Sequence, residues 1–245
     1  MVGWGPAPAF QRAPQPHVLQ RETRLVTSLP LNRRSLLAAA AAIGGAGLLR
    51  ARPAAAQESP VRVTREEPII VRTQFDPARP PPEMPPLTPP EAGVCKTTFE
   101  LSASVTYSAE RLSGLTARIY VDGLDIVTRL RFDIYTAQGA PPKLSAHEEG
   151  HREIGEHYYG DAARIADEIG RRLIGVTFEG AGLDQESAQE NAFGKVIAEI
   201  QRDYMARMRV PSAAANERFD EITRHGLEAI GEAEAIERAI GAVSL

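Results

Sequence analysis

The sequence predicts an α+β fold in which a small antiparallel sheet packs on one long helix and on further helices. Between residues 98 and 135 apolar and polar side chains alternate, which is the period of half-buried strands. In residues 144–173 apolar side chains recur every three or four positions, which is the period of an amphipathic helix. The same helical period returns in residues 185–209 and 227–245.

The composition is typical of one soluble domain with additional segments. Of the 245 residues, 43% are hydrophobic and 24% are charged, and a formal net charge of -4 gives no basic field, so we expect no nucleic-acid partner. The single cysteine, Cys95, excludes an internal disulfide framework and a cysteine-rich metal site, and we expect it to be a small buried hydrophobe. Nitrogen ligands for a metal would come from five histidines: His17, His147, His151, His157 and His225.

The N-terminal segment is typical of an export signal. Arg33 and Arg34 precede a short apolar run, and the small residues up to Ala56 suit cleavage after that position. A bilayer span needs roughly 20 apolar residues, so the run is short for a membrane anchor, which is the alternative. We predict a twin-arginine-type signal peptide over residues 31–56, a periplasmic or secreted location, and no stable membrane span after cleavage. Residues 1–30 are proline-rich and aperiodic, and we expect a disordered leader upstream of the true start.

Residues 57–92 indicate a tether, because eight prolines lie between positions 77 and 90. Such a run favours an extended polyproline II spacer. The apolar run at residues 69–71 fits an edge strand. We place the tether outside the catalytic domain, for which we take residues 93–245.

The alternating segment divides into strands over residues 99–107, 117–121 and 126–134. Asp122 and Gly123 between the last two predict a hairpin turn. The result is an antiparallel sheet of three or four strands with one face in water. Its last strand directly precedes the long helix and could hold an extended peptide there; a sheet that merely covers the helix is the alternative.

The long helix contains the motif His147-Glu148-Glu149-Gly150-His151, which is of the H-E-x-x-H type. Two histidines four residues apart lie on one helix face, about 6 Å apart along the axis, so both can bind one metal ion. Catalytic zinc takes three protein ligands and a water, whose pKa it lowers. Glu148 could take the proton of that water and later give it to the leaving amine. Two core histidines without a metal are the alternative.

Several residues compete for the third ligand position. His157 has the outer spacing of H-E-x-x-H-x-x-G-x-x-H, but that motif needs a glycine where this sequence has Ile154. On an unbroken helix His157 faces about 120° away from His151, so we interpret it as a surface histidine. Carboxylates on the next helix, Glu186 and Glu190, would give a two-His-plus-Glu site.

The remaining candidate segment is residues 219–226. Pro211 and Ser212 open a short helix before it, and Gly226 ends that helix. His225 is the last histidine available, and Glu221, four residues earlier, could orient its ring through a hydrogen bond.

The H-E-x-G-H motif and this distal segment together resemble a family of predicted bacterial secreted zinc-dependent proteases. That family combines H-E-x-G-H with a later aromatic-Asp-x-x-Thr-x-His-Gly motif, which here is Phe219-Asp220-x-x-Thr223-x-His225-Gly226. The resemblance spans about residues 95–227; Phe219 stands where tyrosine is common, and a further tail follows Gly226. It implies a zincin-like peptidase domain with His225 as third ligand and Asp220 as an orienting residue or rival ligand.

We therefore predict that residues 93–245 form a zinc-peptidase-like catalytic domain. It would hydrolyse peptide or protein substrates by means of a zinc-bound water and Glu148. The alternative from another class is a non-enzymatic cell-envelope binding module with a structural zinc site, closed by a carboxylate such as Asp220 or Glu190. A metal-free helical scaffold is the third hypothesis. The amphipathic tail, residues 227–245, would pack on the domain or on an oligomeric partner.

Overall fold

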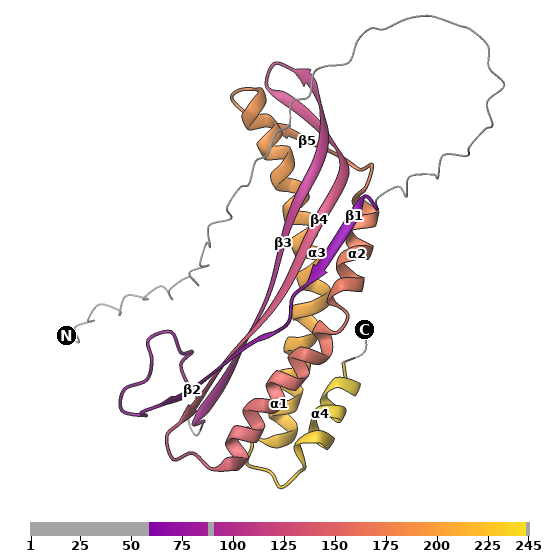
Figure 1. Cartoon of the computed structure of the whole chain (residues 1–245). Helices are drawn as coiled ribbons and strands as arrows, with labels where there is room; N and C mark the ends of the chain where they lie inside the picture. The colour runs from indigo at the N-terminus through magenta and orange to yellow at the C-terminus, as the bar shows by residue number, and fades with distance from the viewer. Residues whose placement is uncertain (1–58, 88–90, 244–245) are drawn as a thin grey trace, which may run out of the picture. The chain divides into compact units, whose positions relative to one another are not determined.

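A long antiparallel hairpin forms the centre of the structure, a computed structural model shown in Figure 1. Its strands are β3 (Gly93–Ser113) and β4 (Thr116–Ala137), joined by the two-residue loop of Gly114 and Leu115. Both strands cover the segments in which apolar and polar residues alternate. The alternation arises because each strand has one face on the protein core and the other in water.

Three short strands lie one after another along the second edge of β4. They are β5 (Thr177–Ala181), which is antiparallel to β4, and β1 (Val61–Arg65) and β2 (Ile69–Phe75), which are parallel to it. Their partners in β4 are residues 116–120, 124–128 and 131–137, in that order. Every pairing in the described sheet therefore involves β4.

The prediction of a small antiparallel sheet is wrong, because the five-stranded sheet contains two parallel pairs, β1 with β4 and β2 with β4. The zincin-like arrangement expected with that sheet is not confirmed. The error arises from residues 57–92, whose proline content favours a tether. This segment contains both parallel strands, of which only β2 coincides with the edge strand expected at residues 69–71. The dense proline run begins at Pro77, after the last residue of β2, so it leaves the backbone N–H groups of both strands free for pairing.

Asp122 and Gly123, which predict a hairpin turn, form a β-bulge inside β4. Thr106 lies opposite Gly123 and Tyr107 lies opposite Val121, so Asp122 is an extra residue in β4. Before the bulge the odd-numbered side chains of β4 are buried, and from Leu124 to Phe132 the even-numbered ones are. Either a turn or a bulge can produce such a change, and here β3 continues on both sides of it.

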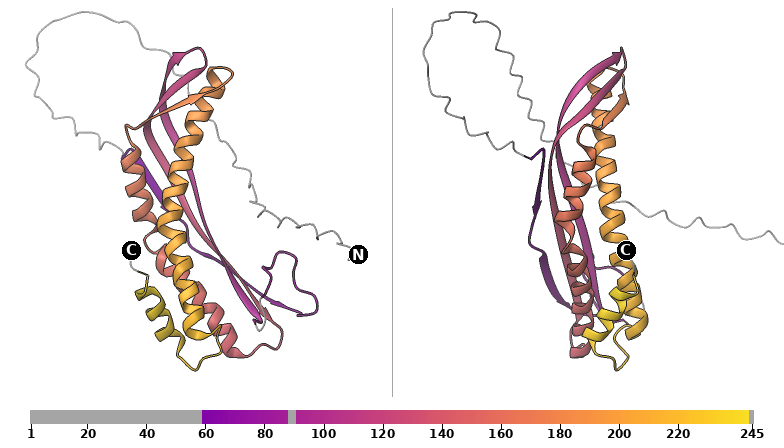
Figure 2. Two further views of the ribbon diagram at one scale, coloured as in Figure 1. Left: turned by 180° about the vertical axis from the view of Figure 1, so that it is seen from behind. Right: turned by 90° about the vertical axis from the view of Figure 1, so that its right-hand side faces the viewer.

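Helices cover one face of the sheet, as Figure 2 shows. They are α1 (Pro142–Tyr159), α2 (Ala162–Leu173), α3 (Gln185–Thr223) and α4 (Glu232–Gly241), the last of which packs against α1 and α3. The main core lies between the helices and the buried side of β4, where Phe132, Ile154 and Tyr204 are fully buried. The ends of α1 and α3 that face α4 are the ones that form the site described below.

Two helix boundaries differ from the predicted ones. The helical period of residues 144–173 is divided between α1 and α2, which Gly160 and Asp161 separate. Conversely, α3 is a single helix of 39 residues that passes through Pro211, where the sequence predicts a new helix. A proline inside a helix removes one backbone hydrogen bond. The burial of Pro211 and of its neighbours Met208 and Ala215 offsets that loss, and the helix continues to Thr223.

The structure describes residues 59–87 and 91–243, which belong to one compact unit. The predicted leader over residues 1–30 and the predicted signal peptide over residues 31–56 lie outside the described residues. Among the helices that are described, none combines the length and the apolar character that a bilayer span requires.

Candidate metal centre

The H-E-x-x-H motif of α1 meets the last turns of α3, and Gly150 makes the contact possible. A Cβ at this position would lie 2.5 Å from Cζ of Phe219. Phe219 is fully buried, stacks on the His147 ring at 4.9 Å between centroids, and meets the His151 ring edge-on at 5.1 Å. The glycine of the motif therefore lets α3 approach closely enough to complete a site that α1 begins.

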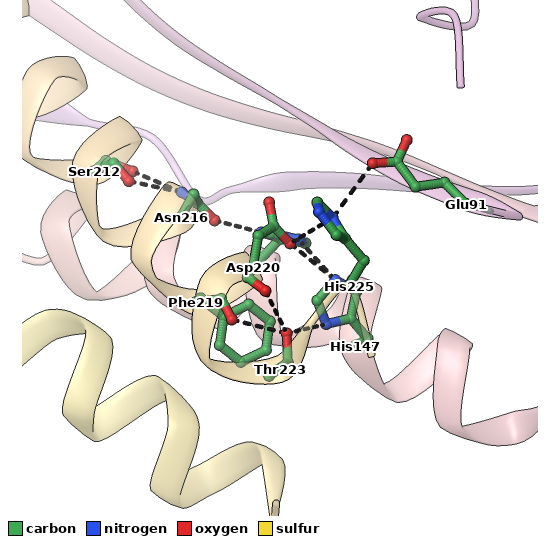
Figure 3. A network of polar contacts seen from close by, with 9 residues as sticks. Glu91, His147, Ser212, Asn216, Phe219, Asp220, Thr223 and His225 are labelled. Carbon is green, nitrogen blue, oxygen red and sulfur yellow. Dashed lines mark hydrogen bonds and ion pairs between the residues drawn. The ribbon is translucent and has the colours of Figure 1, made fainter. Parts of the chain in front are cut away.

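Asp220 directs its carboxylate at both histidines of the motif. Figure 3 shows Asp220 beside His147 and His225. Its Oδ1 lies 3.1 Å from Nε2 of His147 and 3.1 Å from Nε2 of His151, and the two Nε2 atoms are 3.2 Å apart. Three atoms in such a triangle can all lie about 2 Å from one ion, the usual length of Zn–N and Zn–O bonds. Among the described residues, His147, His151 and Asp220 form a group that could hold a metal ion.

The far side of the His151 ring is bound by Asn216. Nδ1 of His151 lies 2.7 Å from Oδ1 of Asn216, and the amide nitrogen of Asn216 donates to the carbonyl of Ser212 at 2.8 Å. Asn216 therefore presents an acceptor to the ring, so the proton of a neutral His151 lies on Nδ1. Its Nε2 lone pair then faces Asp220, as a metal ligand requires.

Thr223 orients the His147 ring in the same way, through the Nδ1 atom of that ring. The Thr223 hydroxyl donates to the carbonyl of Phe219 at 2.7 Å, and its oxygen lies 3.4 Å from Nδ1 of His147. The oxygen can therefore accept from the Nδ1–H group, which leaves the Nε2 lone pair of His147 directed at Asp220. The last two turns of α3 thus carry the third ligand candidate, Asp220, and the two residues that orient His147 and His151.

Two nitrogen lone pairs and a carboxylate oxygen at these distances repel one another unless a positive charge lies among them. Without a metal, a proton on the rings supplies this charge: burial raises the pKa of Asp220, but the hydrogen bonds that protonated ring nitrogens of His147 and His151 donate outweigh burial and hold this pKa below its ordinary value. Burial lowers the pKa of His151, but Asp220 outweighs it and raises that pKa. A divalent ion would supply this positive charge and bind the two nitrogen atoms and the carboxylate oxygen at once, so the three residues fit a metal site.

Glu148 lines the same cavity and is almost completely buried, with 3% of its surface exposed. Burial raises the pKa of its carboxyl group to about 7, with His151 acting to lower it and Asp220 to raise it. The carboxylate accepts a hydrogen bond from the backbone N–H of Cys95, and within the described residues its Oε2 has no partner. Gly93 leaves the space, because a Cβ there would lie 2.9 Å from Oε1 of Glu148.

The first residues of β3 form a wall of this cavity, whose volume is about 260 Å³. The N–H of Ala137 bonds to the carbonyl of Ala92, and bonded pairs alternate along antiparallel strands. The backbone groups of Gly93, Cys95 and Thr97 therefore point away from β4, at an edge of β3 that pairs with no other described strand. The strand predicted to hold a peptide, the one before α1, is β4, and both of its edges are paired here.

His225 lies beside the three ligand candidates, at the end of α3. Arg224 and His225 have left-handed φ values of 46° and 55° after the helix ends. Nδ1 of His225 is 3.3 Å from Oε1 of Glu91 and 3.6 Å from Oδ1 of Asp220, and its side chain is 49% exposed. Ligation by His225 stays a prediction, whereas Asp220 is already within reach of both histidines.

The other candidates for the third ligand lie away from the cavity. His157 is exposed on the continuous helix α1. Glu186 and Glu190 lie near the start of α3, about 45 Å or more from its last turns. Glu221 is 64% exposed and pairs with Arg218 at 2.6 Å.

Sequence reasoning did not identify Asn216, Gly93 or Cys95 as parts of the site. For Asn216 a signal exists, because it precedes Asp220 by four residues and must share its helix face. Gly93 and Cys95 belong to no motif, and only the register of β3 brings them to Glu148. Comparisons of the chain with protein-family models, with curated proteins and with solved structures gave no match.

Proposed function

We propose that the chain is an exported zinc-dependent metallopeptidase, in which His147, His151 and Asp220 hold the metal and Glu148 is the general base. The observation that supports this most is the convergence of three ligand atoms beside a buried carboxylate with a raised pKa. Three protein ligands leave a coordination position for water, which distinguishes catalytic zinc sites from structural ones. Zinc bound here would supply a Lewis acid that polarises a carbonyl group and lowers the pKa of water.

The protein side chains perform the proton transfers and the orientation. Glu148 takes a proton from the attacking water and passes it to the amine that leaves. Its raised pKa suits both steps, because the carboxylate is a stronger base than an exposed glutamate and holds the proton near neutral pH. Phe219 and Asn216 keep the two histidine rings in place, which limits the reorganisation needed during the reaction.

A polypeptide is the substrate class that the surroundings favour. The outward backbone groups of Gly93 and Thr97 and the carbonyl of Cys95 lie in the cavity wall and can bond to an extended chain, as an added strand would. Glu148 bonds to the N–H of Cys95, so the general base lies at this same strand edge. The predicted signal peptide over residues 31–56 is the basis for proposing that the enzyme acts in the periplasm or outside the cell.

A cell-envelope binding module with a structural metal is the second candidate, and the position of His225 favours it. Its Nδ1 atom is 3.6 Å from Oδ1 of Asp220, so a change of side-chain rotamer could make it a fourth ligand. A site closed by four protein ligands has no position for water and does not hydrolyse peptides.

The test is zinc binding and peptide hydrolysis by the purified protein and by Glu148→Gln. We expect one zinc ion per chain in both, and a loss of hydrolysis of about 100-fold or more in the variant. Glu153→Gln is the matched control, because Glu153 is on the same helix, is 53% exposed and contacts Arg152 rather than the cavity. Zinc binding with no hydrolysis by the wild type would support the structural alternative, and equal activity of Glu148→Gln would refute the assigned base.

A further inference from the structure

A second cavity, of about 330 Å³, lies at the start of β3. It is formed by the end of β2, by the loop over residues 76–87, by residues 91 and 92 just before β3, and by the end of β4. Figure 1 shows the loop beside the end of β2. Its walls are five prolines between positions 77 and 86 together with Phe75, Met84, Leu87, Ala92 and Ala137. Glu91 is the one ionisable residue among the described residues that line it. The cavity is therefore suited to an apolar group.

The loop that forms this cavity is held in place from within. Oδ1 of Asp76 accepts the N–H of Ala78 at 2.9 Å, and the carbonyl of Asp76 accepts the N–H of Arg79 at 2.8 Å. A further turn brings the N–H of Met84 to the carbonyl of Pro81 at 3.1 Å. Met84 and Leu87 then pack on the buried side chains at the ends of β2 and β4. A proline-rich wall with these bonds loses little conformational entropy when a ligand enters.

Consecutive residues of the chain line the second cavity and the cavity of the candidate metal centre. Glu91 lines both cavities, and the two residues that follow it divide between them, since Ala92 lines the apolar cavity and Gly93, the first residue of β3, lines the metal cavity. An extended chain along the free edge of β3 directs alternate side chains to one side of the strand. One such side chain can therefore enter the apolar cavity while the neighbouring backbone lies beside Glu148.

We infer that this cavity binds a large apolar side chain of the polypeptide substrate, such as that of leucine, methionine or phenylalanine, close to the bond that is cut. The inference rests on the proposed peptidase function and extends it to a preference for substrate sequence. The volume is near the lower limit of small-molecule pockets, roughly 300–1,000 Å³, so it suits a single side chain. The carboxylate of Glu91 at the boundary of the two cavities disfavours an acidic residue there.

The experiment compares peptides that differ at one position, with phenylalanine, leucine, serine or aspartate. We expect kcat/KM to be roughly tenfold or more higher for the apolar residues, from burial of one large apolar side chain. Met84→Trp fills the cavity and should remove most of that preference. Glu83→Trp is the matched control, because Glu83 is exposed in the same loop and should leave the preference unchanged.

Binding of fluorescent peptides to zinc-loaded Glu148→Gln separates this inference from the proposed function. If the wild type cleaves no peptide, the peptidase proposal fails, and the binding preference alone decides whether the cavity takes an apolar side chain. Loss of that preference in Met84→Trp, with Glu83→Trp unchanged, supports the inference. A preference that is absent in the wild type, or that Met84→Trp leaves intact, overturns it.

Discussion

Replacement of Gly150 by alanine tests how the two halves of the metal centre are held together. The new Cβ would lie 2.5 Å from Cζ and 2.9 Å from Cε1 of Phe219, whereas carbon atoms in contact are about 3.5–4.0 Å apart. The Phe219 ring, or helix α3 with it, must therefore move by about 1 Å. The ring stacks on His147, and the next residue is Asp220, so the movement separates ligand atoms that now lie 3.1 Å apart.

The expected magnitude combines two opposing effects. Alanine is favoured over glycine in a helix interior by about 1 kcal/mol. Overpacking of a full core costs about 1–3 kcal/mol, and more where the neighbour cannot move. At Gly194, in the interior of α3, a Cβ would meet no atom within 4 Å, so Gly194→Ala has only the favourable effect. The helix-propensity gain is common to both variants and cancels, so we expect Gly150→Ala to be less stable than Gly194→Ala by the overpacking cost, about 1–3 kcal/mol.

Thermal unfolding of the metal-free proteins and zinc titration of each variant measure the two consequences. Zinc affinity should fall by about tenfold or more in Gly150→Ala, as it does when groups that orient ligands are displaced, and should be unchanged in Gly194→Ala. Adding Phe219→Leu to Gly150→Ala should recover part of the stability, because the smaller side chain leaves room for the new methyl group. Equal stability and equal zinc affinity of the two alanine variants would refute the close contact between α1 and α3.

Three further predictions concern individual side chains of the centre. Asp220→Asn should weaken zinc binding at least about 100-fold and His225→Ala by less than tenfold in calorimetric titration; the reverse order would make His225 the ligand. Asn216→Leu should retain its circular dichroism spectrum but bind zinc about 10–100-fold more weakly, and unchanged affinity would refute its role in orienting His151. The pKa of Glu148 is raised from 4.5 to about 7 in the folded protein, so the stability it contributes is present below pH 4.5 and is lost as the pH rises through 7. Metal-free wild type should therefore lose roughly 3 kcal/mol relative to Glu148→Gln between pH 4.5 and 8 in denaturant unfolding, and parallel curves would contradict the buried carboxylate.

The local period of apolar residues predicts most of the helices and strands, but it does not predict which strands pair with one another. The helical spacing of residues 142–159 places His147 and His151 on one face, and that half of the centre follows from sequence alone. The pairing of β1 and β2 with β4 joins residues about 60 positions apart. The alternation of residues within a strand does not indicate which other strand it pairs with. Proline content near β2 then favoured a tether, although the prolines follow the strand.

The third ligand illustrates the same limit inside a helix. If Pro211 began a separate short helix, the orientation of residues 219–225 relative to α1 would be undetermined by the sequence. Because α3 continues to Thr223, Asp220 lies on the helix face that meets α1, while His225 lies beyond the helix end in a left-handed conformation. Distinguishing the two therefore required the path of the chain through Pro211.

The arrangement of all strands around β4 has a consequence for self-association. Along residues 124–137, β1 and β2 provide the cover of the second edge of β4 among the described residues. If proteolysis or local unfolding removed them, a row of unpaired N–H and C=O groups in a long strand with one apolar face would be open to strands of other molecules. The two N-terminal strands therefore protect the chain against aggregation through β4, and variants that weaken them should aggregate before they lose helical structure.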